Sequence, residues 1–512
     1  MQLRMWMLDV AREQSFTLDH LYQLATMSLD AGYNALGLYL EHRFAYPSTP
    51  WSHGKGCLTP ETVQRLQSEF PSLQIVPFIN LLGHFEGMLY TEHGKRYREE
   101  LFAGMQASPS NPEFLDLCDR IIDDTVAIFK SPLIHIGGDE TWQLGASPAS
   151  QARMEALAAE YPDVEDPKAR LYGAHFGPLA QKVIDAGRIP GVWGDMYLEH
   201  PEALDLMPKE TVIFDWQYFN GLRESTPKFT ERGFQVVGCP AIQTYNATWC
   251  HLGPTERNIK EVTADAIEMD LHGVCITTWE CALFGAYDTL IPALKASGAI
   301  LSGEKDVSLL GAYYEESADH GEWALRMSDK LAECGGTFTP GKIRSSLKVR
   351  LLLNANPFLA WMHHSDELCG EVGDKALKVI EEAILIAPGE AEKGVCFFAR
   401  ASIEFVRVAE ASRKLYAEGR TEQAVAKLAP LRQMFDDLAK VARATHIRFG
   451  GSLADIERCR IAKEQLERMI QRIRTYGDGS LGYLPAFEVL AHPKFVPHDQ
   501  ACWWLINRWA NQ

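Results

Sequence analysis

The feature that most constrains the fold of this chain is an alternation of short apolar runs with helical patterns across residues 1 to about 300. Each apolar run is followed by a polar or glycine-bearing turn and then by an amphipathic segment. The runs are apolar along their whole length, as expected of parallel strands that are buried on both faces. Eight strands are predicted in this way: Leu3–Leu8, Ala35–Leu40, Gln74–Ile79, Leu133–Ile136, Ile189–Trp193, Val212–Trp216, Gln235–Gly238 and Val274–Thr277.

Eight strands that alternate with helices over about 300 residues predict an α/β fold, a (β/α)8 TIM barrel. A doubly wound open sheet is the alternative. In such a barrel the active site is built at the carboxyl ends of the strands and in the loops that follow them. Polar residues at these positions are therefore the first candidates for function.

A second domain is predicted from about residue 305, where long helical segments replace the alternating pattern. A chain of 512 residues is too long for one ordinary compact domain, so we predict a catalytic barrel over residues 1–304 and an all-α C-terminal domain over residues 305–512. Pro430 should kink or split one of its helices. Near the end, Cys502–Leu505 with Trp509 forms an aromatic segment suited to docking on a partner surface, and the domain is a candidate for homo-oligomer formation.

Charge and cysteine content restrict the partners and the compartment. The net charge of -18 argues against nucleic acid or anionic membrane as the main partner, because both require clustered positive charge. No apolar stretch is long enough to predict a membrane span. The 11 cysteines are scattered without CxxC spacing, and reduced thiols in a cytoplasmic protein are the simplest account of them.

The strongest local signal is the segment from Leu133 to Trp142, LIHIGGDETW, in which a strand runs through two glycines into adjacent carboxylates. Neighbouring residues point in different directions, so Asp139 and Glu140 can address different atoms of one bound molecule. Two acids with different roles would use this geometry. The alternatives are a surface pair that caps the next helix, and a metal site formed by His135, an acid and His84, for which no metal-ligand spacing is present.

The segment His135–Glu140 resembles the HxGGDE signature of family 20 glycoside hydrolases, the β-N-acetylhexosaminidases. Asp9–Arg12 resembles that family's DxxR segment, and Pro77–His84 resembles its PxxxxxGH segment. With Leu38–Phe44, the pattern looks closest to the hexosaminidase D-like branch. Pocket aromatics and polar partners are expected at Trp193, Asp195, Trp216, Tyr245 and Trp279.

Two positions depart from the family pattern. Many members place an aspartate in the loop after the second strand, where Glu41 is the nearest acid here. Many also read Trp-x-Glu after the eighth strand, whereas Trp279 is followed at once by Glu280. The far side of the pocket, and with it the choice between GlcNAc and GalNAc, is therefore left open by the sequence.

The resemblance implies a retaining mechanism in which the 2-acetamido group of the substrate is the nucleophile. Glu140 would be the general acid and then the general base, and Asp139 would orient the acetamido N–H and stabilise the developing positive charge. Tyr245 would donate to the acetamido oxygen. Arg12 would hold the 3- and 4-hydroxyls, or else form a salt bridge, and His84 would tune the acid or serve a structural role.

Tryptophans at three strand ends would supply flat apolar area for the acetyl methyl and the sugar ring. Trp193, Trp216 and Trp279 are these candidates, with packing inside the barrel as the alternative. Asp195, Glu41 and Glu280 are further candidate substrate ligands, and Asp195 could equally bind a neighbouring backbone. The prediction is an exo-acting β-N-acetylhexosaminidase that takes a small-molecule substrate and needs no cofactor and no metal. A non-catalytic glycan-binding barrel and a metal-dependent barrel hydrolase are the alternatives.

Overall fold

The computed structural model describes residues 1–11, 14–54, 56–100, 105–244, 247–279, 286–340, 352, 356–449, 451–477 and 487. Three predicted site residues, Arg12, Tyr245 and Glu280, lie outside the described residues. So does the predicted aromatic docking segment at Cys502–Leu505 and Trp509. Their predicted roles stay predictions.

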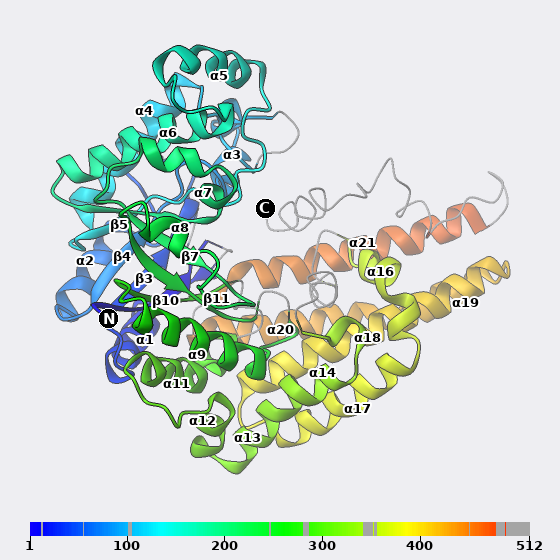
Figure 1. The fold of residues 1–512 in the computed structure, drawn as a ribbon. Helices are drawn as coiled ribbons and strands as arrows, with labels where there is room; N and C mark the ends of the chain where they lie inside the picture. Colours follow the sequence, from blue (N-terminus) through cyan, green and yellow to red (C-terminus); the bar gives the residue numbers. More distant parts are fainter. Residues whose placement is uncertain are drawn as a thin grey trace. The chain divides into compact units, whose positions relative to one another are not determined.

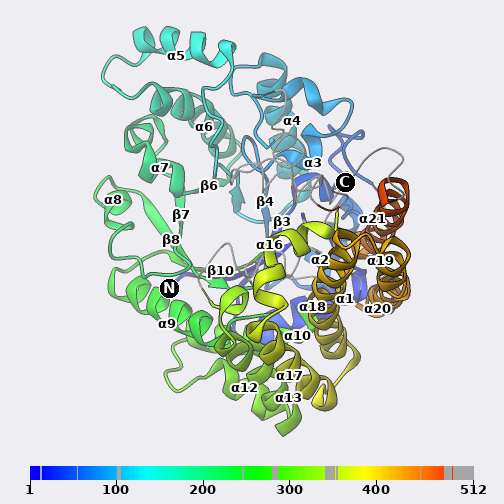
Figure 2. The same cartoon turned by 90° about the vertical axis from the view of Figure 1, so that its right-hand side faces the viewer.

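The first part of the chain is a closed barrel of parallel strands (Figures 1 and 2). Each strand pairs in parallel with the next one along the chain, and β1 closes the ring by pairing with β10 from Leu3 opposite Gly273 to Leu8 opposite Thr278. The predicted barrel is confirmed, and the closing pair excludes the open sheet. Its strands are β1 Leu3–Asp9, β3 Ala35–Tyr39, β4 Gln74–Phe78, β5 Leu133–His135, β6 Ile189–Trp193, β7 Val212–Trp216, β8 Gln235–Cys239 and β10 Gly273–Thr278, with short β9 Ala241–Ile242 beside β10.

The helices between the strands begin at capping residues that the sequence supplies. Asn111 and Ser147 accept hydrogen bonds from backbone N–H groups of the first turns of α4 and α5, and Pro112 and Pro148 follow them at the first helical position. A proline fits there because its missing N–H would have no helical partner. The helices are α1 Leu18–Asp30, α2 Pro60–Glu69, α3 Glu86–Leu89, α4 Pro112–Ile128, α5 Pro148–Glu160, α6 Pro167–Asp185, α7 Asp195–Glu199, α8 Pro227–Thr230, α9 Leu252–Glu268 and α11 Ile291–Leu301.

The chain divides into two compact units. The first contains residues 1–242, 256–279 and 295–307, and the second contains residues 243–255, 280–294 and 308–512. Two segments that follow barrel strands, residues 243–255 and 280–294, therefore group with the C-terminal helices. The predicted boundary between residues 304 and 305 stays a prediction.

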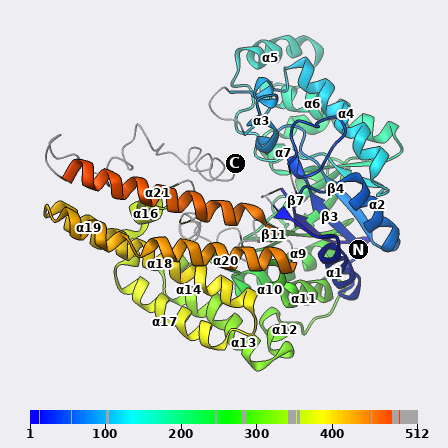
Figure 3. The ribbon, with the colours of Figure 1, turned by 180° about the vertical axis from the view of Figure 1, so that it is seen from behind.

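The second unit is helical, and Figure 3 shows its long helices side by side. Helices α19 and α20 are separated at Ala429 and Pro430, which confirms the predicted break. No helix among the described residues is long and apolar enough to cross a membrane. The helices are α10 Ala286–Thr289, α12 Leu309–Glu316, α13 Ala318–Leu325, α14 Leu331–Glu333, α16 Phe358–Leu368, α17 Glu371–Ile386, α18 Glu390–Ala417, α19 Thr421–Leu428, α20 Leu431–Phe449 and α21 Leu453–Gly477.

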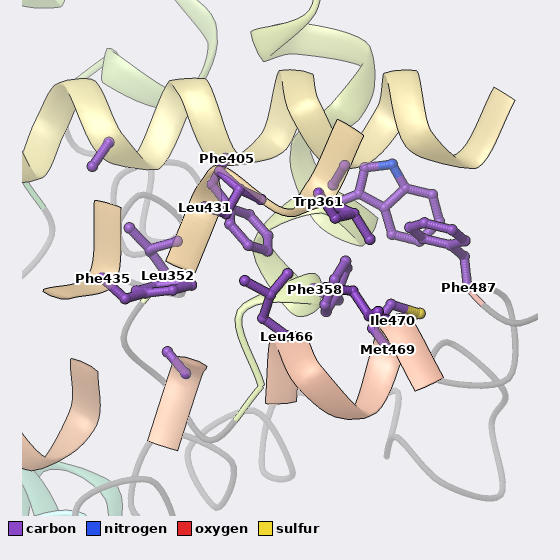
Figure 4. Packing of buried hydrophobic residues seen from close by; sticks show 14 of the residues in the cluster. Leu352, Phe358, Trp361, Phe405, Leu431, Phe435, Leu466, Met469, Ile470 and Phe487 are labelled. Carbon is purple, nitrogen blue, oxygen red and sulfur yellow. The ribbon is translucent and has the colours of Figure 1, made fainter. Parts of the chain in front are cut away.

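An apolar core holds these helices together. Figure 4 shows Phe405 of α18 with Phe358 and Trp361 of α16 and with Leu466 of α21. Phe405 is fully buried, and its ring lies 5.2 Å from that of Phe358. Large side chains packed in this way contribute mainly by burial of apolar surface, which stabilises a fold without specifying any chemistry.

The segment of residues 243–255 is anchored inside the second unit by an aromatic cluster. The Trp249 indole N–H donates to Thr289 Oγ1 at 2.8 Å, and its ring packs edge-to-face on Trp323 at 4.6 Å. Tyr313 packs on the same indole and donates to the Thr289 carbonyl at 2.7 Å. The Leu252 N–H donates to Ser328 Oγ at 2.9 Å. Contacts with the C-terminal helices thus hold this segment at several points.

Candidate active site

The adjacent acids lie at the carboxyl end of β5, where two glycines bend the chain. Gly137 and Gly138 have φ values of 84° and 110°, which residues with side chains rarely adopt. A Cβ on Gly138 would collide with the Tyr172 hydroxyl, which donates to the Gly138 carbonyl at 2.5 Å. The HIGGDE segment therefore needs glycine for its backbone shape and for the close approach of α6.

A residue with left-handed backbone angles follows each of three neighbouring strands. Four non-glycine residues in the described part of the chain have positive φ, and three of them follow β3, β4 and β5: Glu41 at 40°, His84 at 48° and Glu140 at 47°. Such a conformation costs about 1–2 kcal/mol for a residue with a side chain. Strain of this kind gathers at functional sites, where the surrounding structure holds it.

His84 brings the two acids together. Its Nε2 lies 3.0 Å from Glu140 Oε2 and 3.2 Å from Asp139 Oδ2, and its Nδ1 lies 3.7 Å from Glu86 Oε1. One ring nitrogen of His84 therefore faces a carboxyl oxygen of each acid, and it can donate or accept according to the tautomer of the ring. His84 thus contacts Glu140 through Nε2, and its predicted role in tuning the acid stays a prediction.

The two acids differ in their surroundings. Asp139 is buried, and its Oδ1 has no hydrogen-bond partner among the described residues. The Glu140 side chain is 20% exposed, against 10% for that of Asp139. A buried acceptor without a partner costs free energy unless a ligand supplies a donor. Asp139 is thus suited to bind an N–H group, and Glu140 is open to a leaving group and to water.

Asp195, at the start of α7, links three strand ends. Its Oδ2 accepts the Glu140 N–H at 2.9 Å, and its Oδ1 accepts the Trp216 indole N–H at 3.2 Å. Burial raises the pKa of Asp195 to about 8, and the nearby charge of Asp139 adds to the shift. The two N–H groups act in the opposite direction without outweighing burial.

His135 points into the barrel core, away from the metal role considered for it. Its ring stacks on Phe78 at 4.5 Å and lies 4.4 Å from the ring of Trp193. Its Nδ1 accepts the Gly137 N–H at 3.1 Å. Burial holds the pKa of His135 well below its usual range, so the ring is neutral.

A second group of ligand atoms lies beside the acids. Glu41, His84 and Glu86 each offer one atom, and these atoms lie within 4.8 Å of one another. Carboxylate and imidazole groups at such distances can hold a divalent cation. Glu86 carries no motif and was missed by sequence reasoning, although its place two residues after His84 was a usable signal.

The predicted tryptophans gather at the same end of the barrel, in two different environments. Trp193 is fully buried in the barrel core, and its indole nitrogen has no partner among the described residues. Trp216 and Trp279 are only partly buried against that core. Trp279 donates to the Tyr218 hydroxyl at 2.8 Å, and Tyr218 stacks on Trp216 at 5.0 Å.

Sequence reasoning also missed two polar residues that shape this end of the barrel. Tyr218 orients two of the tryptophans, and its signal was its position two residues after Trp216. Asn80 donates to the Tyr39 hydroxyl at 2.6 Å and to the His84 carbonyl at 3.1 Å. It thereby fixes the left-handed turn that presents His84, and it lies within the segment Pro77–His84 already singled out.

Comparison with known proteins agrees with this geometry. Residues 75–269 match the family described as glycosyl hydrolase family 20, catalytic domain, and this range includes β4 to α9 with His84, Asp139, Glu140 and Asp195. No curated protein matches the chain. The hexosaminidase D-like branch stays a prediction.

Several solved structures resemble the chain. A chitobiase from Flavobacterium johnsoniae aligns with 99% of this chain and 78% of its own length, at 15% identity and a TM-score of 0.50. A β-N-acetylhexosaminidase from Bacteroides fragilis covers 62% of this chain and 69% of its own, at 17% identity and a TM-score of 0.47. An exo-β-N-acetylglucosaminidase of the same family from Vibrio harveyi covers 61% and 56%, at 18% identity and a TM-score of 0.49.

At such identities the likeness to the chitobiase shows a shared fold, and the family match over residues 75–269 carries the assignment. Residues 75–269 therefore match a catalytic domain of glycosyl hydrolase family 20, and this match supports a glycoside hydrolase.

Proposed function

We propose that this glycoside hydrolase is an exo-acting β-N-acetylhexosaminidase that releases terminal GlcNAc, GalNAc or both with retention of configuration. The observation that carries the proposal is the pair at the end of β5: a buried Asp139 with an unused acceptor in the described structure, beside a more exposed Glu140 held by His84. An amide N–H is the donor that fits the first, and a glycosidic oxygen fits the second.

In the first step the acetamido oxygen attacks the anomeric carbon while the bond to the leaving oxygen breaks. Glu140 gives its proton to that oxygen, and a cyclic oxazolinium forms from the sugar itself. Asp139 accepts the amide N–H, which orients the group and stabilises the positive charge that develops on it. Because the nucleophile is part of the substrate, the entropy of bringing it to the anomeric carbon is lost on binding and not in the reaction step.

In the second step water attacks the anomeric carbon and the bond to the acetamido oxygen breaks. Glu140 takes the proton from water, which restores the acid for the next cycle. Two displacements at one carbon leave the configuration unchanged. His84 stays bonded to Glu140 Oε2 and keeps the carboxyl group in place through both proton transfers.

The pocket aromatics support the choice of a 2-acetamido sugar. The rings of Trp193 and Trp279 lie 6.0 Å apart, and that of Tyr39 lies 4.8 Å from Trp279. Apolar faces of this kind suit an acetyl methyl and the C–H face of a pyranose. Arg12, Glu41, Tyr245 and Glu280 remain the predicted ligands for the hydroxyls and the acetamido oxygen.

A panel of nitrophenyl β-glycosides, gluco and galacto, with and without the 2-acetamido group, tests the proposal. We expect cleavage of 2-acetamido sugars alone, inhibition by an oxazoline mimic, and a β-configured first product. The gluco and galacto arms decide the epimer. Equal hydrolysis of plain glucosides would overturn the mechanism, and binding without turnover would favour a glycan-binding barrel.

A metal-dependent hydrolase is the second candidate, because Glu41, His84 and Glu86 offer cation ligands beside the acids. It predicts that chelator abolishes activity and that zinc or another divalent ion restores it. The substrate-assisted reaction assigns His84 to Glu140 instead and predicts full activity in chelator.

We also propose a cytoplasmic setting. All nine cysteines in the described part of the chain are free thiols, which supports a reducing compartment. Non-reducing electrophoresis of protein taken directly from cells, with thiols blocked at lysis, tests it. Disulfide-linked cysteines in that sample would contradict the proposal.

A further inference from the structure

We propose that Asp195 is a positioning residue that fixes the backbone of Glu140 and the indole of Trp216, and that it acts on the rate of the reaction rather than on sugar binding. The inference rests on the proposed function, because Glu140 must be the acid for its position to matter. It also gives Asp195 one of the two roles that the sequence left open.

The position of Asp195 suits this role. It is the first residue of α7 and follows β6 after a single glycine, so a strand of the barrel holds its backbone. Its two carboxyl oxygens point to different elements, one to the N–H of Glu140 after β5 and the other to the indole of Trp216 at the end of β7. One side chain thus joins the ends of three consecutive strands.

Glu140 needs such a contact because its backbone is strained. With φ at 47°, it occupies the left-handed region that residues with side chains avoid. Its carbonyl accepts the Trp142 N–H at 2.9 Å, and its N–H has Asp195 as its partner. Loss of the Asp195 contact would leave a partly buried N–H without this acceptor and would let the turn relax toward ordinary backbone angles.

Two oxygens are needed at this position. Both oxygens of a carboxyl group keep acceptor capacity in either protonation state, so each N–H finds a partner. An amide offers a single acceptor and places its NH2 group against the other donor. Asparagine should therefore keep half of the arrangement, and alanine none of it.

The Asp195 contacts should affect the reaction rate because they set the position of the Glu140 carboxyl group. A carboxyl group that moves by about 1 Å can lose on the order of 10²-fold in rate even when binding is intact. Trp216 is the pocket aromatic on the opposite side of Asp195, so the same carboxyl group sets the spacing between the acid and that ring. Loss of Asp195 should lower kcat and leave KM little changed.

The test compares Asp195→Asn and Asp195→Ala with a matched control, Asp215→Asn. Asp215 is a buried aspartate whose pKa is likewise raised by burial, and it lies on β7 next to Trp216. Ser225 Oγ and Thr226 Oγ1 donate to its Oδ2 at 2.6 Å and 2.7 Å, and Gln217 Nε2 donates to its Oδ1 at 3.0 Å. Asp215 thus bonds neither to the Glu140 N–H nor to the Trp216 indole. The control should lower the melting temperature and leave kcat of the folded enzyme unchanged.

Each variant is assayed with a nitrophenyl 2-acetamido glycoside and with its 4-deoxy and 6-deoxy analogues. We expect kcat to fall about 10²-fold for Asp195→Ala and about tenfold for Asp195→Asn. The ratio of kcat/KM for each deoxy analogue to that for the parent glycoside should stay as in the native enzyme. If Asp195→Ala does not fold, the nearly isosteric Asp195→Asn still gives the result.

Three outcomes overturn the inference. Loss of discrimination against a deoxy sugar, or a rise in KM alone, would make Asp195 a hydroxyl ligand. An unchanged kcat would remove its role, and a loss shared with Asp215→Asn would reflect general damage. A native enzyme that cleaves no 2-acetamido glycoside would refute the proposed function itself, which is a separate and recognisable result.

Discussion

The end of β5 and the core of the helical unit are built in opposite ways. At the end of β5, carboxyl groups face one another around one histidine, and the Glu140 backbone lies in the left-handed region. In the helical core, large apolar rings fill the space between helices of ordinary geometry. The first arrangement costs stability and the second supplies it, which is the pattern expected when one region serves chemistry and the other the fold.

The comparison predicts a separation of effects. Substitutions at the end of β5 should change turnover with little loss of stability, because they remove charge or strain rather than packing. Substitutions in the helical core should change stability and leave the chemistry of the folded enzyme intact. A variant at the end of β5 that mainly loses stability, or a variant in the helical core that loses turnover when folded, would contradict the comparison.

The largest effect is expected for Glu140→Gln. Loss of the general acid should lower kcat about 10²- to 10⁴-fold for a substrate with a sugar leaving group. The loss should be smaller for a nitrophenyl leaving group, which departs without a proton. Steady-state kinetics on both substrates, with a thermal melt, measure this.

Glu99→Gln is the control for Glu140→Gln. Glu99 is a buried acid of the same unit that accepts the Ser147 N–H at 3.0 Å. Its substitution should lower the melting temperature with kcat retained. A Glu140 variant that melts far earlier than the native chain would show that Glu140 supports the fold.

Phe405→Ala should have the largest effect on stability. Removal of a fully buried ring from the helical core should cost about 3–5 kcal/mol, because the cavity cannot fully collapse. Thermal unfolding measures the change, and kcat is measured well below the new transition. Leu385→Ala is the control, since Leu385 is 85% exposed and should change little. A fall in kcat of the folded Phe405 variant would show that the helical unit takes part in catalysis.

Asp139→Asn should lower kcat about 10²- to 10³-fold, the usual effect of removing one group that stabilises transition-state charge. The amide would direct either an oxygen or an NH2 group at the acetamido N–H and would carry no charge. Kinetics with the nitrophenyl 2-acetamido glycoside measure it. Because nitrophenolate needs no proton, Asp139→Asn should affect this substrate more than Glu140→Gln does. The opposite order would contradict the division of roles.

The last effect concerns the pH dependence of stability. The folded-state pKa of Asp195, about 8, lies above its ordinary value of 3.8, so between these values the folded chain holds a proton that the unfolded chain has lost. The free energy of unfolding should therefore fall as pH rises through that window. The ionisable groups around Asp195 are Asp139 and Glu140 after β5, Tyr172 of α6 and Tyr197 of α7.

Asp195→Asn should flatten this dependence, because the amide does not titrate. Melting temperatures across the window, for the native chain and the variant, measure the difference. Parallel curves for the two proteins would show that Asp195 ionises normally.

Much of the barrel could be predicted because its signals are local. Each apolar run bounded by turns became a strand, and the glycines before Asp139 indicated the bend that presents the acids. Pro430 likewise separates two helices, because a proline lacks the backbone N–H that a helix interior needs.

Contacts between distant segments could not be predicted. The two donors to Asp195 come from residues 55 positions before it and 21 after it, and no pattern in the sequence joins them. Glu86 and Tyr218 acquire their roles only through the neighbours that folding provides. The grouping of residues 243–255 with the C-terminal helices depends on Trp249, Tyr313 and Trp323, which are far apart in the chain.

The most direct test of the account is the rate of a series of substrates whose acetamido methyl carries zero, one, two or three fluorines. If the amide oxygen attacks the anomeric carbon beside Asp139, kcat/KM should fall steeply with each fluorine, because fluorine withdraws electrons from the nucleophile. Rates that stay level across the series would show that the amide only binds, and that another group performs the displacement.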